Sequence, residues 1–121
     1  MIALGTTLRC NLPPRHLWVA LSDPQQTGDA ILLVSLTTLR EGCVDDVCIL
    51  EAADFPGYLT HATSVAYSRA KAGSAGALAD AVADGSFTVV SPIPQPTLAR
   101  IIAGARKSDE LSASNKQLLP R

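Results

Sequence analysis

The chain has 121 residues, of which 47% are hydrophobic and 17% charged, and its formal net charge is −1. These values are typical of one globular domain with a buried core, and they exclude both a disordered chain and a global basic field that would attract nucleic acid. The longest apolar run is far shorter than the roughly 20 residues of a membrane-spanning helix, so we expect no membrane segment.

The first predicted elements are two strands. Ala3–Arg9 favours a short edge strand, which Pro13 and Pro14 end because proline has no N–H to give to a sheet. Leu17–Leu21 is an apolar run between prolines, as expected of a buried or half-buried strand. The polar segment Ser22–Asp29, with its Asp-Pro and Gly-Asp turn signals, predicts a loop.

Ala30–Leu36 gives the clearest strand signal in the chain, because a continuous aliphatic run implies burial on both faces. With Leu17–Leu21 it predicts an antiparallel pair, in which the start of one strand lies beside the end of the other. We therefore expect one end of the sheet to gather a cation, an imidazole and two hydroxyls, from Arg15, His16, Thr37 and Thr38. Trp18 is interpreted as core or barrel-wall packing, with base stacking as the alternative.

Carboxylates and thiols cluster around the next predicted strand, Val47–Glu51. Asp45 and Asp46 precede it and suggest either a solvated strand entry or acid–base and metal chemistry. Together with Cys43, Cys48 and the two histidines, they could supply the ligands of a metal site, and we call this the metal-dependent interpretation. The cysteine spacing is not that of a zinc ribbon or finger, so we expect no metal and no cofactor. Three cysteines also argue against a secreted disulfide framework and favour a cytoplasmic location.

The second half of the chain predicts a loop over 52–59, then two strands, two helices and a tail. His61–Tyr67 alternates as a strand does, but Thr63–Ala72 is also compatible with a helix. Ser74–Asp84 predicts a helix with Ser74 as N-cap and Gly85 in a left-handed C-terminal position. Ser86–Ser91 predicts a short strand. A last helix, opened by Pro96, carries one apolar stripe, formed by Leu98, Ile101, Ile102 and Ala105.

These elements predict an α+β fold in which five or six short strands form a small antiparallel barrel-like sheet, with two helices in the C-terminal half. We expect a single domain over residues 1–109. The polar segment 110–121 predicts a loosely ordered tail, or one that wraps a partner subunit through Leu118 and Leu119.

Two sequence segments, RHLWVALSDP followed by ILLVSLTT, resemble the PemK/MazF family of toxins from bacterial toxin–antitoxin systems. SVAY and LARIIAGARKS are similar to a divergent, phage- or orphan-type branch of that family. The resemblance implies an SH3-like barrel with added helices, a homodimer, and a metal-independent endoribonuclease that cuts single-stranded RNA and is inhibited by a cognate antitoxin. It places the family's catalytic arginine at Arg15 and its threonine or serine at Thr37 or Thr38.

The residues fit that chemistry. RNA cleavage without a metal uses the 2′-hydroxyl as nucleophile and needs a proton acceptor, a proton donor and positive charge on the phosphate. Arg15 can hold a phosphate bidentately, and His16 or His61 can move protons near neutral pH. Candidates for substrate binding are Trp18, His61, Ser64 and Tyr67. The alternative function is a catalytically inactive barrel that binds a protein or nucleic acid.

Overall fold

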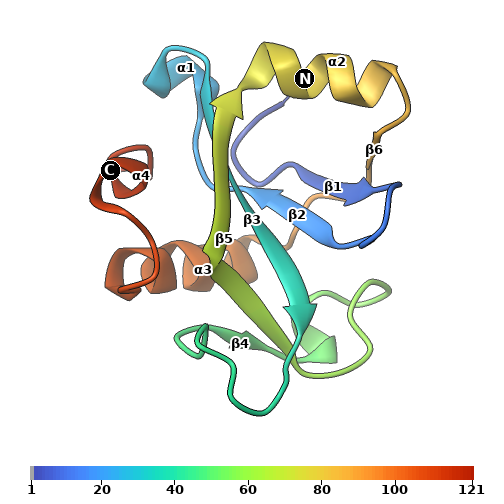
Figure 1. The fold of residues 1–121 in the computed structure, drawn as a ribbon, viewed down its shortest axis with the longest axis vertical. Coiled ribbons are helices and arrows are strands. Elements are labelled where there is room, and N and C mark those ends of the chain that lie inside the picture. The colour runs from blue at the N-terminus through green and yellow to red at the C-terminus, as the bar shows by residue number, and fades with distance from the viewer. Residues whose placement is uncertain (1) are drawn as a thin grey trace.

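The computed structural model describes residues 2–121, and its centre is a six-stranded antiparallel sheet in the order β4-β5-β3-β2-β1-β6 (Figure 1). The strands are β1 (Thr7–Cys10), β2 (Leu17–Ala20), β3 (Ala30–Thr38), β4 (Ile49–Leu50), β5 (Thr63–Ser74) and β6 (Phe87–Val89). The helices are α1 (Pro24–Thr27), the 3₁₀ turn η1 (Ala52–Asp54), α2 (Ala75–Ala83), α3 (Gln95–Lys107) and α4 (Ala113–Lys116). The predicted α+β fold with a small antiparallel sheet is confirmed.

Strands β3 and β5 are the longest of the sheet and are neighbours in it. They pair from Ala30↔Ser74 to Thr38↔Thr63, with one irregularity between Leu33 and Ser35. The segment 63–72, for which the sequence also allowed a helix, is therefore a strand. Its alanines have a good helix propensity, but pairing along the whole buried length of β3 outweighs that local preference.

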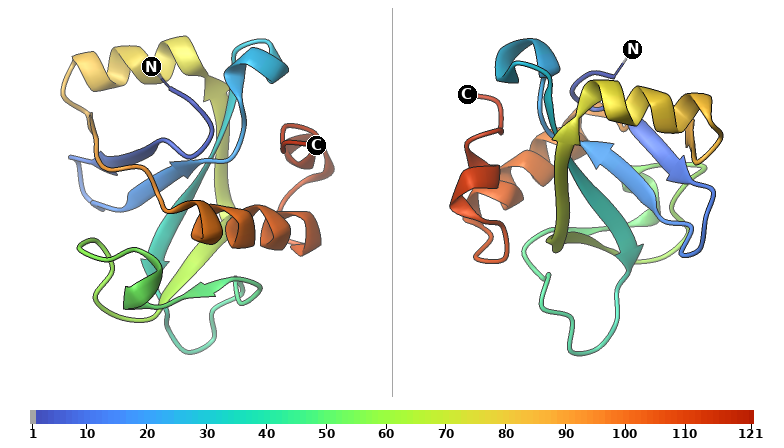
Figure 2. Two further views of the ribbon diagram at one scale, coloured as in Figure 1. Left: turned by 180° about the vertical axis from the view of Figure 1, so that it is seen from behind. Right: turned by 45° about the horizontal axis from the view of Figure 1, so that its top comes forward.

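The two faces of the sheet carry separate apolar clusters, because neighbouring residues of a strand point to opposite faces. Leu32, Val34 and Leu36 of β3 belong to the larger cluster, which α3 covers. Ile31 and Leu33 belong to the smaller one, which includes Leu78 of α2. Figure 2 shows α3 lying across the sheet and α2 at one end of the molecule. Among residues 2–121, α2 therefore covers one end of its face of the sheet and leaves the other end without a helix.

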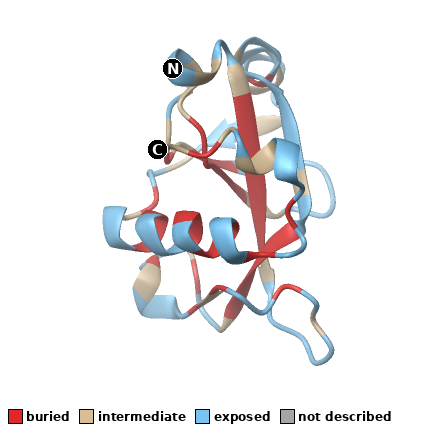
Figure 3. Cartoon of the chain, turned by 90° about the vertical axis from the view of Figure 1, so that its left-hand side faces the viewer, coloured by how far each residue is buried: buried red, intermediate tan, exposed pale blue. Residues whose placement is uncertain are grey.

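The predicted start and end signals of the helices are present. The Ser74 hydroxyl accepts a hydrogen bond from the amide of Ala77 and caps α2, and Gly85 follows that helix with a φ of +88°. The apolar stripe of α3 is buried, whereas its opposite side is exposed (Figure 3). Gly104 lets α3 approach the sheet closely, since a Cβ there would lie 2.5 Å from the Tyr67 hydroxyl.

Two N-terminal elements differ from the sequence prediction. The first strand is not at the edge of the sheet, because β1 pairs with β2 on one side and with β6 on the other. The segment 22–29 is not wholly loop, since it contains the short helix α1. Asp23 caps α1 by accepting from the amide of Gln25, and Gly28 ends it with a φ of +68°.

The segment 110–121 also differs from the prediction, because it folds back onto the domain. Leu111 and Leu119 are buried in the larger apolar cluster, and Leu118 packs against it. The hydroxyl of Ser112 accepts from the amide of Asn115 and caps α4. Leu118 and Leu119, the leucines proposed from the sequence as contacts to a partner subunit, thus contact this chain's own core. Across residues 2–121, no helix has both the length and the apolar character needed to cross a bilayer.

Candidate functional site

A pocket of about 220 Å³ opens where β2 begins and β3 ends. The β2–β3 register pairs Leu17 with Leu36, which places the residues before β2 beside the residues after Leu36. The structure thus brings the four candidates for catalysis together. The polar residues that line this pocket are Arg15, His16, Thr37, Thr38, Tyr58, Thr60, His61 and Thr63.

A second pocket, of about 360 Å³, adjoins the first and shares His16, Thr37 and Thr38 with it. The loop between β3 and β4 and the middle of β5 supply its other walls. Its remaining polar lining consists of Arg40, Glu41, Cys43, Asp45, Ser68 and Arg69. We call the two pockets together the site groove. His16 and the two threonines therefore stand between its two halves.

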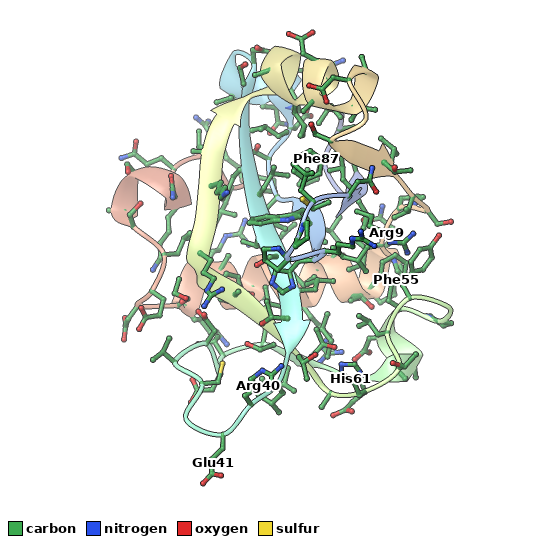
Figure 4. The ribbon with its side chains drawn as sticks, turned by 45° about the vertical axis from the view of Figure 1, so that its right-hand side comes forward. Arg9, Arg40, Glu41, Phe55, His61 and Phe87 are labelled. Atoms are coloured by element: carbon green, nitrogen blue, oxygen red, sulfur yellow. The ribbon has the colours of Figure 1, made fainter. Side chains whose placement is uncertain are left out.

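His61 is held in the groove by two hydroxyl groups. Its Nε2 lies 2.9 Å from the Thr38 Oγ1, and its Nδ1 lies 3.0 Å from the Thr60 Oγ1. Thr38 ends β3, whereas Thr60 and His61 lie in the loop before β5. Figure 4 shows His61 and Arg40 near the tip of β3. The two contacts fix the plane of an otherwise exposed imidazole.

The groove carries more positive than negative charge, because three arginines line it with two carboxylates, Glu41 and the hydrogen-bonded Asp45. Arg15, Arg40 and Arg69 line it, and Glu41 lies beside them in the loop after β3. Among residues 2–121 the one salt bridge joins Arg100 to Asp54, away from this groove. The three guanidinium groups are thus available for an anionic ligand such as a phosphate.

Hydrogen bonds anchor the loop between β3 and β4 to β5. The Asp45 carboxylate accepts from the amide and the hydroxyl of Ser68, at 2.9 and 2.5 Å. The Ser64 hydroxyl donates to the Asp45 carbonyl at 2.5 Å. This buried carboxylate therefore shapes the groove wall through structural contacts.

The side chains that the sequence suggested as metal ligands do not form one cluster. Cys48 is buried in the larger apolar cluster, where burial raises the pKa of its thiol. Cys43 instead contacts the Asp45 carbonyl and the Ser64 hydroxyl. In the described part of the chain, no three His, Cys, Asp or Glu side chains are arranged to hold a metal ion.

Three candidates for substrate binding are buried rather than open to the groove. Trp18 packs in the cluster under α2, and the Lys71 ammonium lies 5.4 Å from the centre of its ring. Ser64 is fully buried. Tyr67 is 1% exposed and donates a hydrogen bond to the Ile101 carbonyl at 2.6 Å. Their contacts give these three residues packing roles in this structure, whereas His61 lines the groove.

Sequence reasoning missed several groove residues. Tyr58 and Thr60 lie in a segment predicted only as loop, and the position of Thr60 directly before His61 was the available signal. Arg40 and Arg69 lie in the wall of the second pocket. No local pattern marks them, because the folding of the loop after β3 against β5 brings them together.

Comparison with known proteins addresses the fold. No protein-family model matches this sequence, and no curated protein sequence matches it. Among solved structures, a chain of the crystal structure of MazE–MazF (Form-II) from Deinococcus radiodurans superposes with a TM-score of 0.56. The superposition covers 92% of this chain and 97% of that chain, at 14% sequence identity. The protein has a MazF-like fold.

The sequence resemblance to the PemK/MazF family is thus confirmed at the level of the fold. The superposition covers nearly all of both chains, so the MazF-like fold accounts for the sheet together with most of the surrounding helices. At 14% identity the likeness concerns backbone architecture, and any activity has to be argued from the site groove.

Proposed function

We propose that this protein is an endoribonuclease toxin that cleaves single-stranded RNA without a metal ion. The observation that carries the proposal is the convergence of Arg15, His16, Thr37 and Thr38 in one groove of a MazF-like fold. A groove lined by arginines suits a phosphodiester backbone, and its hydroxyls and imidazoles suit proton transfer and hydrogen bonding at the phosphate.

In this proposal Arg15 holds the scissile phosphate. Its guanidinium can donate two parallel hydrogen bonds to the non-bridging oxygens and offset the charge that they gain in the transition state. The hydroxyls of Thr37 and Thr38 donate further hydrogen bonds to the same phosphate. His16, at the boundary of the two pockets, moves protons. The substrate's own 2′-hydroxyl is the nucleophile, so the protein has to supply only charge, position and proton transfer.

The proposal includes partners. The structure to which this chain is similar contains MazE as well as MazF. By analogy, we propose that a cognate antitoxin protein binds this chain and blocks the groove, and that the active form is a homodimer. The proposed place of action is the cytoplasm, where single-stranded RNA is available.

The test is incubation of the purified protein with mixed-sequence single-stranded RNA in EDTA. We expect discrete fragments from the wild type. Arg15→Ala should cleave roughly 100-fold more slowly or worse, because removing one donor to a transition-state oxyanion costs about 10²–10³ in rate. Arg121→Ala removes an exposed arginine outside the groove and is the matched control. Circular dichroism checks that each variant is folded.

Three results would contradict the proposal. Intact RNA from a well-folded wild type at high concentration would favour the inactive binding module. Cleavage that EDTA abolishes would point to the metal-dependent interpretation. Equal activity of wild type and Arg15→Ala would remove Arg15 from the site.

A further inference from the structure

The two histidines of this chain line the same pocket. They reach it from opposite sides of β3, because His16 precedes β2 and His61 lies just before β5. Strands β2 and β5 are the two neighbours of β3 in the sheet. The end of β3, with Thr37 and Thr38, therefore lies between the two imidazoles.

We propose that His16 and His61 are the general base and the general acid of the reaction, working on opposite sides of a phosphate held at the end of β3. This inference rests on the proposed ribonuclease function and adds a second catalytic histidine to it. Attack by the 2′-oxygen proceeds in line with departure of the 5′-oxygen. The proton acceptor and the proton donor must therefore stand on opposite sides of the phosphorus, and the sheet order places the segments that carry these two histidines on opposite sides of β3.

The hydrogen bonds hold His61 in place for the role of acid. A protonated imidazole has two N–H donors, and a threonine hydroxyl oxygen can accept from either. Both nitrogens of His61 already contact hydroxyls, those of Thr38 and Thr60. A threonine hydroxyl can also donate, so the two contacts hold the ring in either protonation state, with Nε2 beside the place at Thr38 where a leaving oxygen would bind. Thr60, on the far nitrogen, is a positioning residue.

His16 is the proposed base, because its surroundings differ from those of His61. Among residues 2–121 the His16 ring has no hydrogen-bond partner, although His16 lines both pockets. A neutral His16 therefore has a ring nitrogen lone pair available for the proton of a 2′-hydroxyl. Its half-buried position beside Leu17 keeps it close to the two threonines.

The step balances without any added reactant. His16 takes the proton of the 2′-hydroxyl, the 2′-oxygen bonds to phosphorus, the bond from phosphorus to the 5′-oxygen breaks, and His61 gives its proton to that oxygen. The products are a 2′,3′-cyclic phosphate and a 5′-hydroxyl. Afterwards His16 loses one proton to water and His61 regains one.

Other charged and titratable groups also influence a pH profile measured at this groove. Those that line it with the histidines are Arg15, Arg40, Glu41, Cys43, Asp45, Tyr58 and Arg69. With a base and an acid both required, kcat against pH should be bell-shaped, and each histidine variant should lose one limb of the bell.

The test compares ordinary RNA with RNA whose 5′ bridging oxygen is replaced by sulfur, since a thiolate leaves without being protonated. On ordinary RNA, His16→Ala and His61→Ala should each be about 10²–10⁴-fold slower than wild type. On the sulfur substrate His61→Ala should approach the wild-type rate, whereas His16→Ala should stay slow. Thr60→Val should lower kcat less and shift the pH limb assigned to His61. Glutamine variants of both histidines serve if an alanine variant misfolds.

The outcomes separate this inference from the function on which it rests. Wild-type cleavage with histidine variants within about threefold of it would overturn the two-histidine assignment and leave a ribonuclease that works through Arg15. Restoration of His16→Ala instead of His61→Ala by sulfur would reverse the roles and overturn the assignment as stated. A wild type that cleaves neither substrate would overturn the ribonuclease proposal itself.

Discussion

The sheet face that α2 partly covers is apolar and packed at one end and polar and open at the other, although the same strands form both ends. Along β3 the residues on this face read Ile31, Leu33, Ser35 and Thr37, and at the first of these α2 lies over the sheet. At the last, no helix within residues 2–121 covers the sheet, and the site groove opens. A single strand therefore passes from a packed end to a polar, open end within a few residues.

Strand β2 shows the same change in the opposite direction along the chain. Ala20 and Trp18 belong to the cluster under α2, and His16, two residues earlier, borders the groove. The comparison shows that residues on one face of a strand can pack into a core at one end and line a polar site at the other. The packed end holds the strands in register, and the register in turn sets the distance between His16 and the threonines.

The largest expected effect is loss of stability at the packed end. Leu8 is fully buried in the cluster under α2, so Leu8→Ala should lower the free energy of unfolding by about 2–5 kcal/mol. The folded fraction should keep the wild-type cleavage rate, because the groove is untouched. Denaturant unfolding and the rate per folded molecule check the two statements. A rate that falls while the protein is fully folded would show that the two ends are not separate.

A substitution at the open end should leave stability nearly unchanged and slow the cleavage. Thr38→Val removes the hydroxyl that contacts His61 on an exposed strand end, so stability should stay within about 0.5 kcal/mol. Cleavage should fall roughly 10–100-fold, which corresponds to about 1.4–2.7 kcal/mol of transition-state stabilisation. Thr88→Val, at an exposed threonine of β6, is the control and should keep full activity. Equal rates for both variants would argue against a role for Thr38.

Tyr67 tests the packing on the opposite face of the sheet, where it contacts α3. Burial raises the pKa of its hydroxyl above the ordinary value of 10.0, so the unfolded chain loses this proton at a lower pH than the folded protein. The stability that this group contributes is therefore complete below about pH 10 and is lost as the pH rises further. Tyr67→Phe should cost about 1–2 kcal/mol at neutral pH, because the hydrogen bond to the Ile101 carbonyl is lost. It should also reduce the alkaline loss, as unfolding curves at pH 8 and about pH 11 would show; an unchanged alkaline slope would contradict this cause.

The smallest effect is expected at the boundary between the ends. The Ser35 hydroxyl is buried and, within residues 2–121, has no hydrogen-bond partner. Ser35→Ala should therefore raise the free energy of unfolding by about 1 kcal/mol, because an unsatisfied buried hydroxyl is removed. Thermal unfolding of the variant beside wild type measures this. A destabilised variant would show that the hydroxyl is satisfied in solution.

The sequence predicted the features that depend on neighbouring residues. The aliphatic run Ala30–Leu36 sets β3, its pairing with β2 follows from the turn between them, and Ser74 and Gly85 mark the bounds of α2. The closeness of Arg15 to Thr38 could be reasoned out because it needs only one hairpin-like register.

Other features depend on contacts far apart in the chain, and these the sequence did not reveal. The strand β5 competes with a helix in an alanine-rich segment, and its pairing with β3 decides the outcome. Leu118 and Leu119 form an isolated apolar pair in a polar segment, so no periodic pattern predicts the burial of Leu119 against the core. The contact of His61 with Thr38 needs the whole loop before β5 to fold back across the end of β3.

The most direct test of this account is to locate a bound substrate analogue by amide NMR. The probe is a 2′-O-methyl version of an RNA that the protein cleaves, since the methyl group removes the nucleophile. The account predicts that shift changes concentrate at Arg15, His16, Thr38 and His61, and that the amides of Leu8, Leu78 and the rest of the packed end stay unchanged. Changes centred under α2, with the site groove unaffected, would contradict it.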